Sequence, residues 1–162
     1  MILRNETAAD AAEIAAVVTA AFLGHPYSDG TEAQLVSALR QGGALLLSLV
    51  ADEGGQILGH VAASSATVGE VAGWAAIGPL AVRPGHQRRG IGSALMAAAL
   101  AGLRGQRGAV LVGYADYYRL FGFAPQPGLT VPGVPDEHVL GLAFPPHPVP
   151  HGEIGFHPAF GL

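Results

Sequence analysis

The sequence predicts a single α/β domain with a mixed β-sheet, and three observations lead to this prediction. Its 162 residues are the length of one domain. Hydrophobic residues make up 50% of the chain and charged residues only 12%, which excludes a disordered protein and allows a sizeable core. The patterns along the chain give a strand, two helices and three strands, and then helices that alternate with strands, which is typical of a mixed sheet.

The first quarter of the chain predicts one strand and two helices. Residues 2–4 form the strand, and Thr7 with Asp10 resembles a capping box in which Asp replaces the usual Glu. The helix that follows has apolar residues at helical spacing along one face. These residues are Ile14, Val17, Val18, Ala21 and Phe22. A second helix is predicted over residues 31–40, and a pair of glycines ends it.

Three strands are predicted next. Residues 44–51 and 56–67 read as a hairpin around a turn at 52–55. The third strand, 74–82, contains Pro79. Because proline cannot donate a hydrogen bond to a sheet, we expect this strand to bulge or lose pairing at that residue.

The second half of the chain continues with a helix over residues 89–103, whose small residues permit a close approach to the sheet. A buried strand is predicted at 110–114 and a short helix at 116–120. The composition then changes, since eight of the twelve prolines lie between residues 125 and 150. We expect one or two final strands within 128–144 and an extended tail on the surface.

The whole chain, 1–162, is therefore expected to form one domain, with a core of 1–124 and a Pro- and His-rich end of 125–162. Residues 1–10 lack the basic region followed by an apolar run that marks a signal peptide. Charges interrupt every apolar stretch before it reaches about 18 residues, the length of a membrane-spanning helix. We therefore expect a cytoplasmic protein with no membrane partner.

Composition also excludes several kinds of chemistry. The chain has no Cys, and all eight of its basic residues are Arg, so thiol nucleophiles, thiolate metal sites and Lys-based mechanisms are excluded. The net charge of −4 argues against a nucleic-acid partner. His147, His151 and His157 lie four and six residues apart in a Pro-rich segment, which matches no established ligand pattern, so no metal is predicted.

A phosphate-binding site is predicted at the start of the helix over residues 89–103, which follows the strand at 74–82. The N-terminus of a helix presents unpaired backbone N–H groups and a positive dipole end, which bind anions. Gly90 and Gly92 leave those amides accessible, and Arg88 and Arg89 add positive charge. Two other interpretations remain: the glycines serve only helix–sheet packing, or the turn binds a nucleotide. Leu95 stands where a dinucleotide fingerprint needs its third glycine or alanine.

Two motifs in this region resemble those of the GNAT N-acetyltransferases. Leu80-Ala81-Val82-Arg83-Pro84 followed by Gln87-x-x-Gly90-x-Gly92 is similar to the family's acyl-CoA-binding motif, Q/R-x-x-G-x-G/A. Tyr118-Arg119-Leu120-Phe121-Gly122-Phe123 is similar to its Y-x-x-x-G-F signature. The resemblance covers residues 1–123. It implies a mostly antiparallel sheet in which the fourth and fifth strands run parallel and splay apart, flanked by helices.

The resemblance also implies the co-substrate, acetyl-CoA, and the residues that hold it. The backbone of Leu80, Ala81 and Val82 would bind the pantetheine arm. The phosphates would lie on the turn and first helical residues, namely Gln87, Arg88, Arg89, Gly90, Ile91, Gly92 and Ser93. Tyr118 would protonate the departing CoA thiolate, since a phenol with a pKa near ~10 is protonated at neutral pH. The other interpretation of Tyr118 is a packing aromatic beside Tyr117 and Phe121.

The expected activity is transfer of acetyl from acetyl-CoA to a primary amine, by direct attack on the thioester. The acceptor would be a small-molecule or peptide amine, and a homodimer is plausible because pairing is common in the superfamily. The strand at 74–82 lacks the Glu that many relatives carry there, so no general base is assigned. Candidates are Glu70, His60, His25 and Glu32. The alternative function is an acyl-CoA-binding sensor or partner domain with little or no turnover.

The last residues add one more resemblance. Gly152-Glu153-Ile154-Gly155-Phe156-His157-Pro158-Ala159-Phe160 is similar to a G-x-I/V-x-[FY]-H-P-A-F stretch at the end of a bacterial branch of predicted acetyltransferases. The resemblance implies a tail that packs back on the sheet and walls the substrate pocket.

Overall fold

The computed structural model describes residues 1–26 and 28–161. The helices are α1 (Ala11–Phe22), α2 (Glu32–Gln41), α3 (Ile91–Gly102) and the short α4 (Ala115–Tyr118), with single 3-10 turns η1 (Ala8–Asp10), η2 (Arg119–Phe121), η3 (Asp136–His138) and η4 (Pro158–Phe160). The longer strands are β1 (Ile2–Asn5), β2 (Leu45–Glu53), β3 (Gln56–Val68), β4 (Val71–Val82), β5 (Gly108–Val112), β8 (Val139–Ala143) and β9 (Gly152–Gly155). Two strands have two residues each, β6 (Ala124–Pro125) and β7 (Leu129–Thr130).

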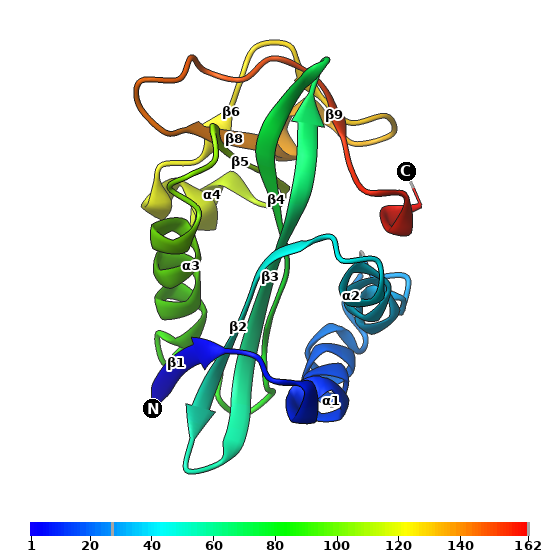
Figure 1. Cartoon of the computed structure of the whole chain (residues 1–162), viewed down its shortest axis with the longest axis vertical. Coiled ribbons are helices and arrows are strands. Elements are labelled where there is room, and N and C mark those ends of the chain that lie inside the picture. Colours follow the sequence, from blue (N-terminus) through cyan, green and yellow to red (C-terminus); the bar gives the residue numbers. More distant parts are fainter. Residues whose placement is uncertain (27, 162) are drawn as a thin grey trace.

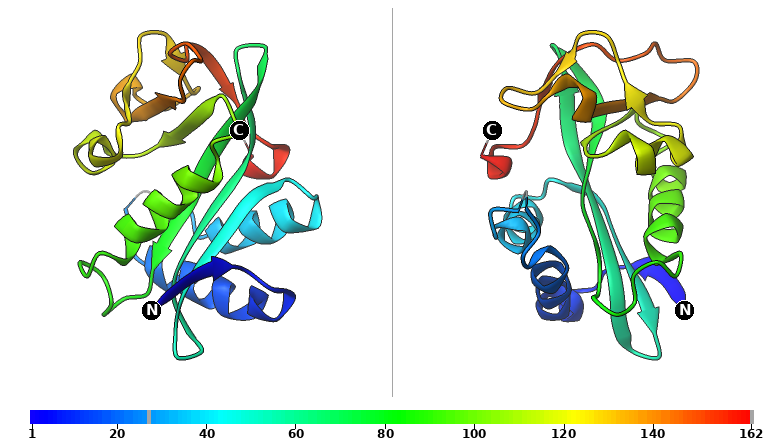
Figure 2. Two further views of the ribbon diagram at one scale, coloured as in Figure 1. Left: turned by 60° about the vertical axis from the view of Figure 1, so that its left-hand side comes forward. Right: turned by 180° about the vertical axis from the view of Figure 1, so that it is seen from behind.

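The strands form a mixed sheet in the order β1-β2-β3-β4-β5-β8-β6, with β9 joining β3 and β7. Neighbouring strands along that order are antiparallel except for the parallel β4–β5 pair. Helices α1 and α2 cover one face and α3 the other (Figures 1 and 2). This is the mixed α/β arrangement that the sequence predicted.

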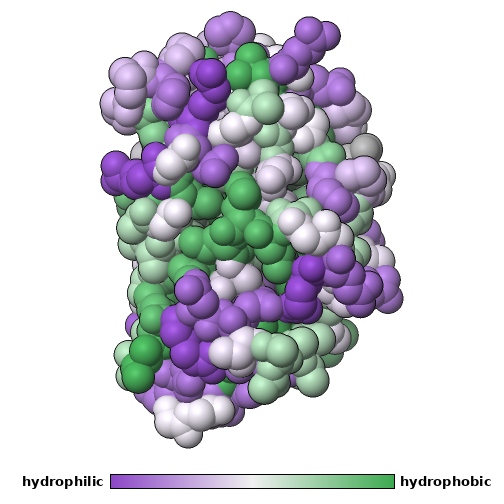
Figure 3. Space-filling view, in the orientation of Figure 1, coloured by the Kyte–Doolittle hydropathy of each residue, from purple (hydrophilic) through white to green (hydrophobic). Residues whose placement is uncertain are grey.

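The two helical layers bury separate apolar clusters. Ile14, Val17 and Val18 of α1 pack on Val50, Ile57 and Ala81 of the sheet. On the other face α3 buries Leu95 and Met96 against β2, β3 and β4. On the face seen in Figure 1, apolar side chains gather over the middle of the molecule and polar ones over its margins (Figure 3). The sheet therefore has a packed core on both sides, as its long apolar strands require.

The entry into α1 is fixed by a charged contact. Asp10 accepts a hydrogen bond from the Thr7 backbone N–H at 2.7 Å, which is half of the predicted capping box. Its two carboxylate oxygens also accept from the Arg4 guanidinium at 2.7 and 3.0 Å. These bonds, with Arg4 first, hold the pKa of the Asp10 carboxyl well below its ordinary range. The first strand and the first helix are thereby tied together.

A bulge interrupts β4 at Gly78 and Pro79. Ala63 of β3 pairs with Ile77 of β4, and Val61 pairs with Leu80, so one residue of β3 faces two of β4. The bulge predicted at Pro79 is therefore confirmed. Before the bulge, β4 pairs with β5 over Trp74–Ala76 and Gly108–Val110, and from there to Val82 β4 pairs with β3 but not with β5. The splay implied by the resemblance is present.

Two predictions near the C-terminus were wrong in detail. The strand expected at 110–114 occupies Gly108–Val112, because Gly108 lies within the sheet: a Cβ there would stand 2.2 Å from the Leu142 carbonyl oxygen. The extended tail contains a true strand, β9. Because β2 begins only at Leu45, opposite Ser64, the last residues of β3 have a free edge, and Thr67 and Val68 pair there with Gly155 and Ile154 of β9.

Beneath α1 and α2 runs a buried polar chain. His60 of β3 is fully buried, and its Nε2 lies 2.7 Å from the Ser48 hydroxyl of β2. Ser48 also donates to Glu6, which accepts from Arg40 of α2 at 2.6 and 3.0 Å. The other ring nitrogen of His60, Nδ1, is buried, and no described residue forms a hydrogen bond with it. Burial lowers the pKa of His60 to about 4.

Candidate active site

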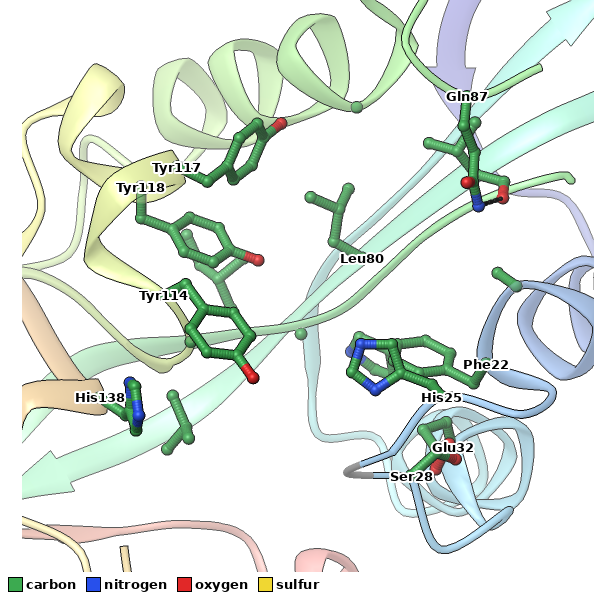
Figure 4. A pocket seen from close by; sticks show the side chains of 18 of the residues that line it. Phe22, His25, Ser28, Glu32, Leu80, Gln87, Tyr114, Tyr117, Tyr118 and His138 are labelled. Atoms are coloured by element: carbon green, nitrogen blue, oxygen red, sulfur yellow. Dashed lines mark hydrogen bonds between the residues drawn. The ribbon is translucent and has the colours of Figure 1, made fainter. Parts of the chain in front are cut away.

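A cavity of about 1050 Å³ lies where β4 and β5 separate. Its walls come from the end of α1 and the start of α2, the part of β4 beyond the bulge, the turn into α3, the segment around α4, and the loop that leads into η3. In Figure 4, Phe22, His25, Ser28 and Glu32 project from one side, and Tyr114, Tyr118 and His138 project from the opposite side. The cavity therefore passes between the two halves of the sheet.

One end of the cavity is the N-terminus of α3. The first backbone hydrogen bond of this helix joins Ala94 N–H to Gly90 C=O, so the N–H groups of Ile91, Gly92 and Ser93 precede the hydrogen-bonded turns. Gly90 has φ of +82°, a left-handed conformation that an L side chain rarely adopts, and a Cβ there would meet nothing within 4 Å. The turn is thus open toward the cavity, which fits an anionic group such as a phosphate.

The exposed edge of β4 forms the middle of the cavity. Arg83 N–H donates to the Leu58 carbonyl of β3 at 2.7 Å. Since backbone groups alternate in direction along a strand, those of Leu80 and Val82 face away from β3, into the gap left by β5. The Val82 carbonyl accepts a bond from the Gln87 side chain at 3.2 Å. A strand edge of this kind can bind an extended ligand through amide groups.

Tyr118 lies beside that edge. Its ring packs edge-to-face on Tyr117 and Phe123, with centroids 5.0 and 6.2 Å apart. A Cβ on Gly113 would stand 2.5 Å from the Tyr118 ring, so only a glycine at this position leaves room for the ring. The hydroxyl points into the cavity on the side of Leu80 (Figure 4). Burial, with a smaller effect from Tyr117, raises the pKa of Tyr118 to about 12, so the phenol is protonated at neutral pH.

The structure brings most of the predicted site residues together. Those that line the cavity are Leu80, Val82, Gln87, Arg88, Gly90, Gly92, Ser93 and Tyr118. The other three are placed differently. Ala81 is buried under α1, with its backbone toward β3. The side chain of Ile91 is in the core on the α3 face, which leaves only its backbone amide for a ligand, and Arg89 is exposed on the turn.

Of the four candidates for a general base, two line the cavity and two do not. His25 and Glu32 line the cavity. His60 is buried beneath α1 and α2, and Glu70 is exposed at the turn between β3 and β4. Neither His60 nor Glu70 is among the described residues of the cavity wall.

Sequence analysis missed several residues of the opposite wall. Tyr114 and His138 lie side by side there, with ring centroids 5.1 Å apart at an interplanar angle of 78°. Tyr117 places its hydroxyl 3.4 Å from that of Ser93, at the start of α3. The only signal in the sequence was the cluster of three tyrosines around the second motif, and nothing local linked His138 to it.

The tail packs on the sheet through β9, and η4 lies near the end of α2, where a Cβ on Gly42 would be 3.6 Å from the His157 ring. Within residues 1–26 and 28–161, however, no tail residue beyond His138 lines the cavity. The expectation that the tail walls this pocket was therefore wrong. In the same part of the chain, no three His, Asp or Glu side chains gather to hold a metal ion, and no helix is long and apolar enough to cross a membrane.

The sequence profile of the acetyltransferase (GNAT) family matches residues 13–123. The chain belongs to this family. The match runs from α1 to the end of the second motif and so includes every residue predicted to bind or act on the co-substrate. The fold and both motifs of this GNAT protein agree with that membership.

Relatives extend the comparison. A GNAT family acetyltransferase from Brucella melitensis, solved in complex with acetyl-CoA, is 43% identical, with a TM-score of 0.86 and coverage of 98% of this chain and 97% of that one. The Escherichia coli N-acetyltransferase YhbS, solved with CoA, also has a TM-score of 0.86, at 28% identity over 99% of this chain and 92% of its own. Sequence alignment with YhbS of strain K12 gives 36% identity over 127 residues, 76% of this chain and 73% of that protein.

Proposed function

We propose that this GNAT protein is an N-acetyltransferase that moves the acetyl group of acetyl-CoA to a primary amine. One observation carries the proposal: a single cavity joins the open N-terminus of α3, the unpaired edge of β4 and the hydroxyl of Tyr118. The complexes of the Brucella protein with acetyl-CoA and of YhbS with CoA support the choice of co-substrate.

Each part of the cavity has a role in the proposal. The amides of Ile91, Gly92 and Ser93 hold the pyrophosphate at the helix terminus. The backbone groups of Leu80 and Val82 hydrogen-bond the pantetheine arm, in the place that a neighbouring strand would otherwise take. This leaves the thioester on the side of Tyr118.

The chemistry is a direct transfer. The neutral amine attacks the thioester carbonyl carbon, a C–N bond forms, and the C–S bond breaks. Tyr118 donates its proton to the departing thiolate, and the amine loses its proton to water or to His25, a base candidate on the cavity wall.

The first experiment is calorimetric titration of the protein with acetyl-CoA, with ATP and NAD as controls. We expect selective binding of acetyl-CoA. Binding of ATP or NAD instead would favour the nucleotide interpretation of the glycine turn and overturn the proposal. Binding of acetyl-CoA without transfer to any amine would leave the sensor as the function.

The second experiment separates the two neighbouring tyrosines. Tyr118→Phe removes the proposed acid, and we expect turnover to fall about a hundredfold or more with little change in acetyl-CoA affinity. Tyr117→Phe removes a hydroxyl that points at Ser93, and we expect it to change acetyl-CoA affinity more than turnover. Unchanged turnover in Tyr118→Phe would remove Tyr118 from the role of acid.

A further inference from the structure

The cavity has an end that the co-substrate does not explain. It lies between the start of α2 on one side and Tyr114 and His138 on the other, and we name it the acceptor end. With His neutral, the formally charged side chains among its described residues are Asp29 and Glu32, both negative. The one arginine on the described cavity wall, Arg88, lies in the turn at the N-terminus of α3. The acceptor end is therefore acidic.

The two carboxylates are neighbours. Asp29 accepts hydrogen bonds from the hydroxyl and the backbone N–H of Thr31, which lower the pKa of its carboxyl, and Glu32 lies beside it. Glu32 accepts a hydrogen bond from Ser28 and is half-buried. Among the described residues, no arginine forms an ion pair with either carboxylate. Two adjacent negative charges in a cavity wall are stabilised by a cation placed between or beside them.

Aromatic rings form part of the remaining surface of the acceptor end. Phe22 comes from the end of α1, while Tyr114 and His138 face it from the opposite wall (Figure 4). Such surfaces pack against methylene groups, and the ring faces of Phe and Tyr also attract cations. The chemistry that fits is an aliphatic chain that ends in a positive charge.

From this arrangement we infer that the acceptor is a small aliphatic amine with a second positive charge, a terminal diamine in its simplest form. One nitrogen, as the neutral amine, attacks the thioester beside Tyr118. The other, as an ammonium ion, binds Asp29 and Glu32, and the chain between them lies along Phe22 and Tyr114. The inference rests on the proposed function, because it names the substrate class of that same site.

Three acceptors with the same four-carbon chain test it: a terminal diamine, butylamine, and an aminobutyrate whose carboxylate is at the far end. They differ only in the charge that would meet the carboxylates, which is positive, absent or negative. We expect kcat/KM for the diamine to exceed that for butylamine by about tenfold to a hundredfold, the range for a hydrogen bond to a charged group. The aminobutyrate should be the poorest acceptor.

The variant Asp29→Asn tests the assigned contact, because the amide oxygen can still accept from the backbone N–H and hydroxyl of Thr31 while the charge is lost. We expect the diamine preference to fall about tenfold, with kcat/KM for butylamine and acetyl-CoA affinity unchanged. Glu70→Gln is the matched control, since it removes one exposed carboxylate outside the cavity wall, and it should keep the wild-type preference.

The outcomes are distinguishable. Equal use of the diamine and butylamine by the wild-type protein would overturn the inference and leave the proposed function standing. So would preference for the aminobutyrate, or for a peptide N-terminus that carries no second positive charge. An unchanged diamine preference in Asp29→Asn would also overturn it. Absence of transfer to every amine, in protein that binds acetyl-CoA, would overturn the proposed function and this inference together.

Discussion

His60 predicts how the stability of the protein depends on pH. Burial lowers the pKa of this histidine from an ordinary 6.5 to about 4 in the folded protein. The unfolded chain therefore binds a proton on His60 below about pH 6.5, whereas the folded protein does not. Proton binding to His60 therefore lowers the free energy of the unfolded state only. The free energy of unfolding is highest above pH 6.5 and falls as the pH is lowered toward 4.

The magnitude follows from the difference between the two pKa values. At about 1.4 kcal/mol per pKa unit, the full effect is about 3 kcal/mol. Roughly 2 kcal/mol of it should be lost between pH 7 and pH 5. The paired carboxylates of Glu6 and Asp10, whose pKa values are lowered in the fold, lose their contribution only below their ordinary pKa values of 4.5 and 3.8. Between pH 7 and pH 5, therefore, the change in the free energy of unfolding comes from the histidines rather than from these carboxylates.

Urea unfolding at pH 7, 6 and 5 measures this effect. The variant His60→Leu fills a similar volume without a titrating group, so its free energy of unfolding should change about 2 kcal/mol less over the interval than that of the wild type. His151→Gln, at an exposed histidine, is the control and should keep the wild-type slope. If His60→Leu showed the wild-type slope, the buried histidine would not be the source of the pH dependence.

Three further changes test other parts of the structure. Gly90→Glu should abolish acetyl-CoA binding in calorimetry, because it places bulk and negative charge at the α3 turn and a side chain at φ of +82°; retained affinity would place the phosphates elsewhere. Gly108→Ala should lower the free energy of unfolding by about 1–3 kcal/mol, because its Cβ would overlap the Leu142 carbonyl. Gly105→Ala, whose Cβ would have no atom within 4 Å, should change it by less than about 0.5 kcal/mol. Equal effects of the two substitutions would contradict the packing argument. Deletion of residues 150–162 removes β9 and its buried Ile154 and should lower the urea midpoint; an unchanged midpoint would show that the tail does not stabilise the sheet.

Local chemistry in the sequence was enough to predict the elements around the co-substrate site. Pro79 must interrupt the ladder of any strand that contains it, and the bulge lies there. The glycine-rich turn at residues 87–93 located the start of α3 to within two residues, since the helix expected from Arg89 begins at Ile91. Membership of the GNAT family, inferred from two short motifs, was confirmed by the profile match.

Features that depend on register between distant segments could not be predicted. The strand β5 begins two residues earlier than expected because Gly108 fits beneath Trp74, a contact that no local pattern shows. The strand β9 pairs with β3 because β2 begins opposite Ser64 and leaves the last residues of β3 with a free edge. The acceptor end has the same origin, since His138 meets Tyr114 only when β8 pairs with β5.

The short contact between β4 and β5 has a mechanical consequence. Three residue pairs, Trp74–Ala76 with Gly108–Val110, join one half of the sheet to the other, and beyond them the halves diverge around the cavity. The second tie is β9, which bridges β7 in one half to β3 in the other. The tail thus cross-links the two halves of the sheet beside the cavity, which should limit how far its walls can move apart, although no described tail residue beyond His138 lines the cavity.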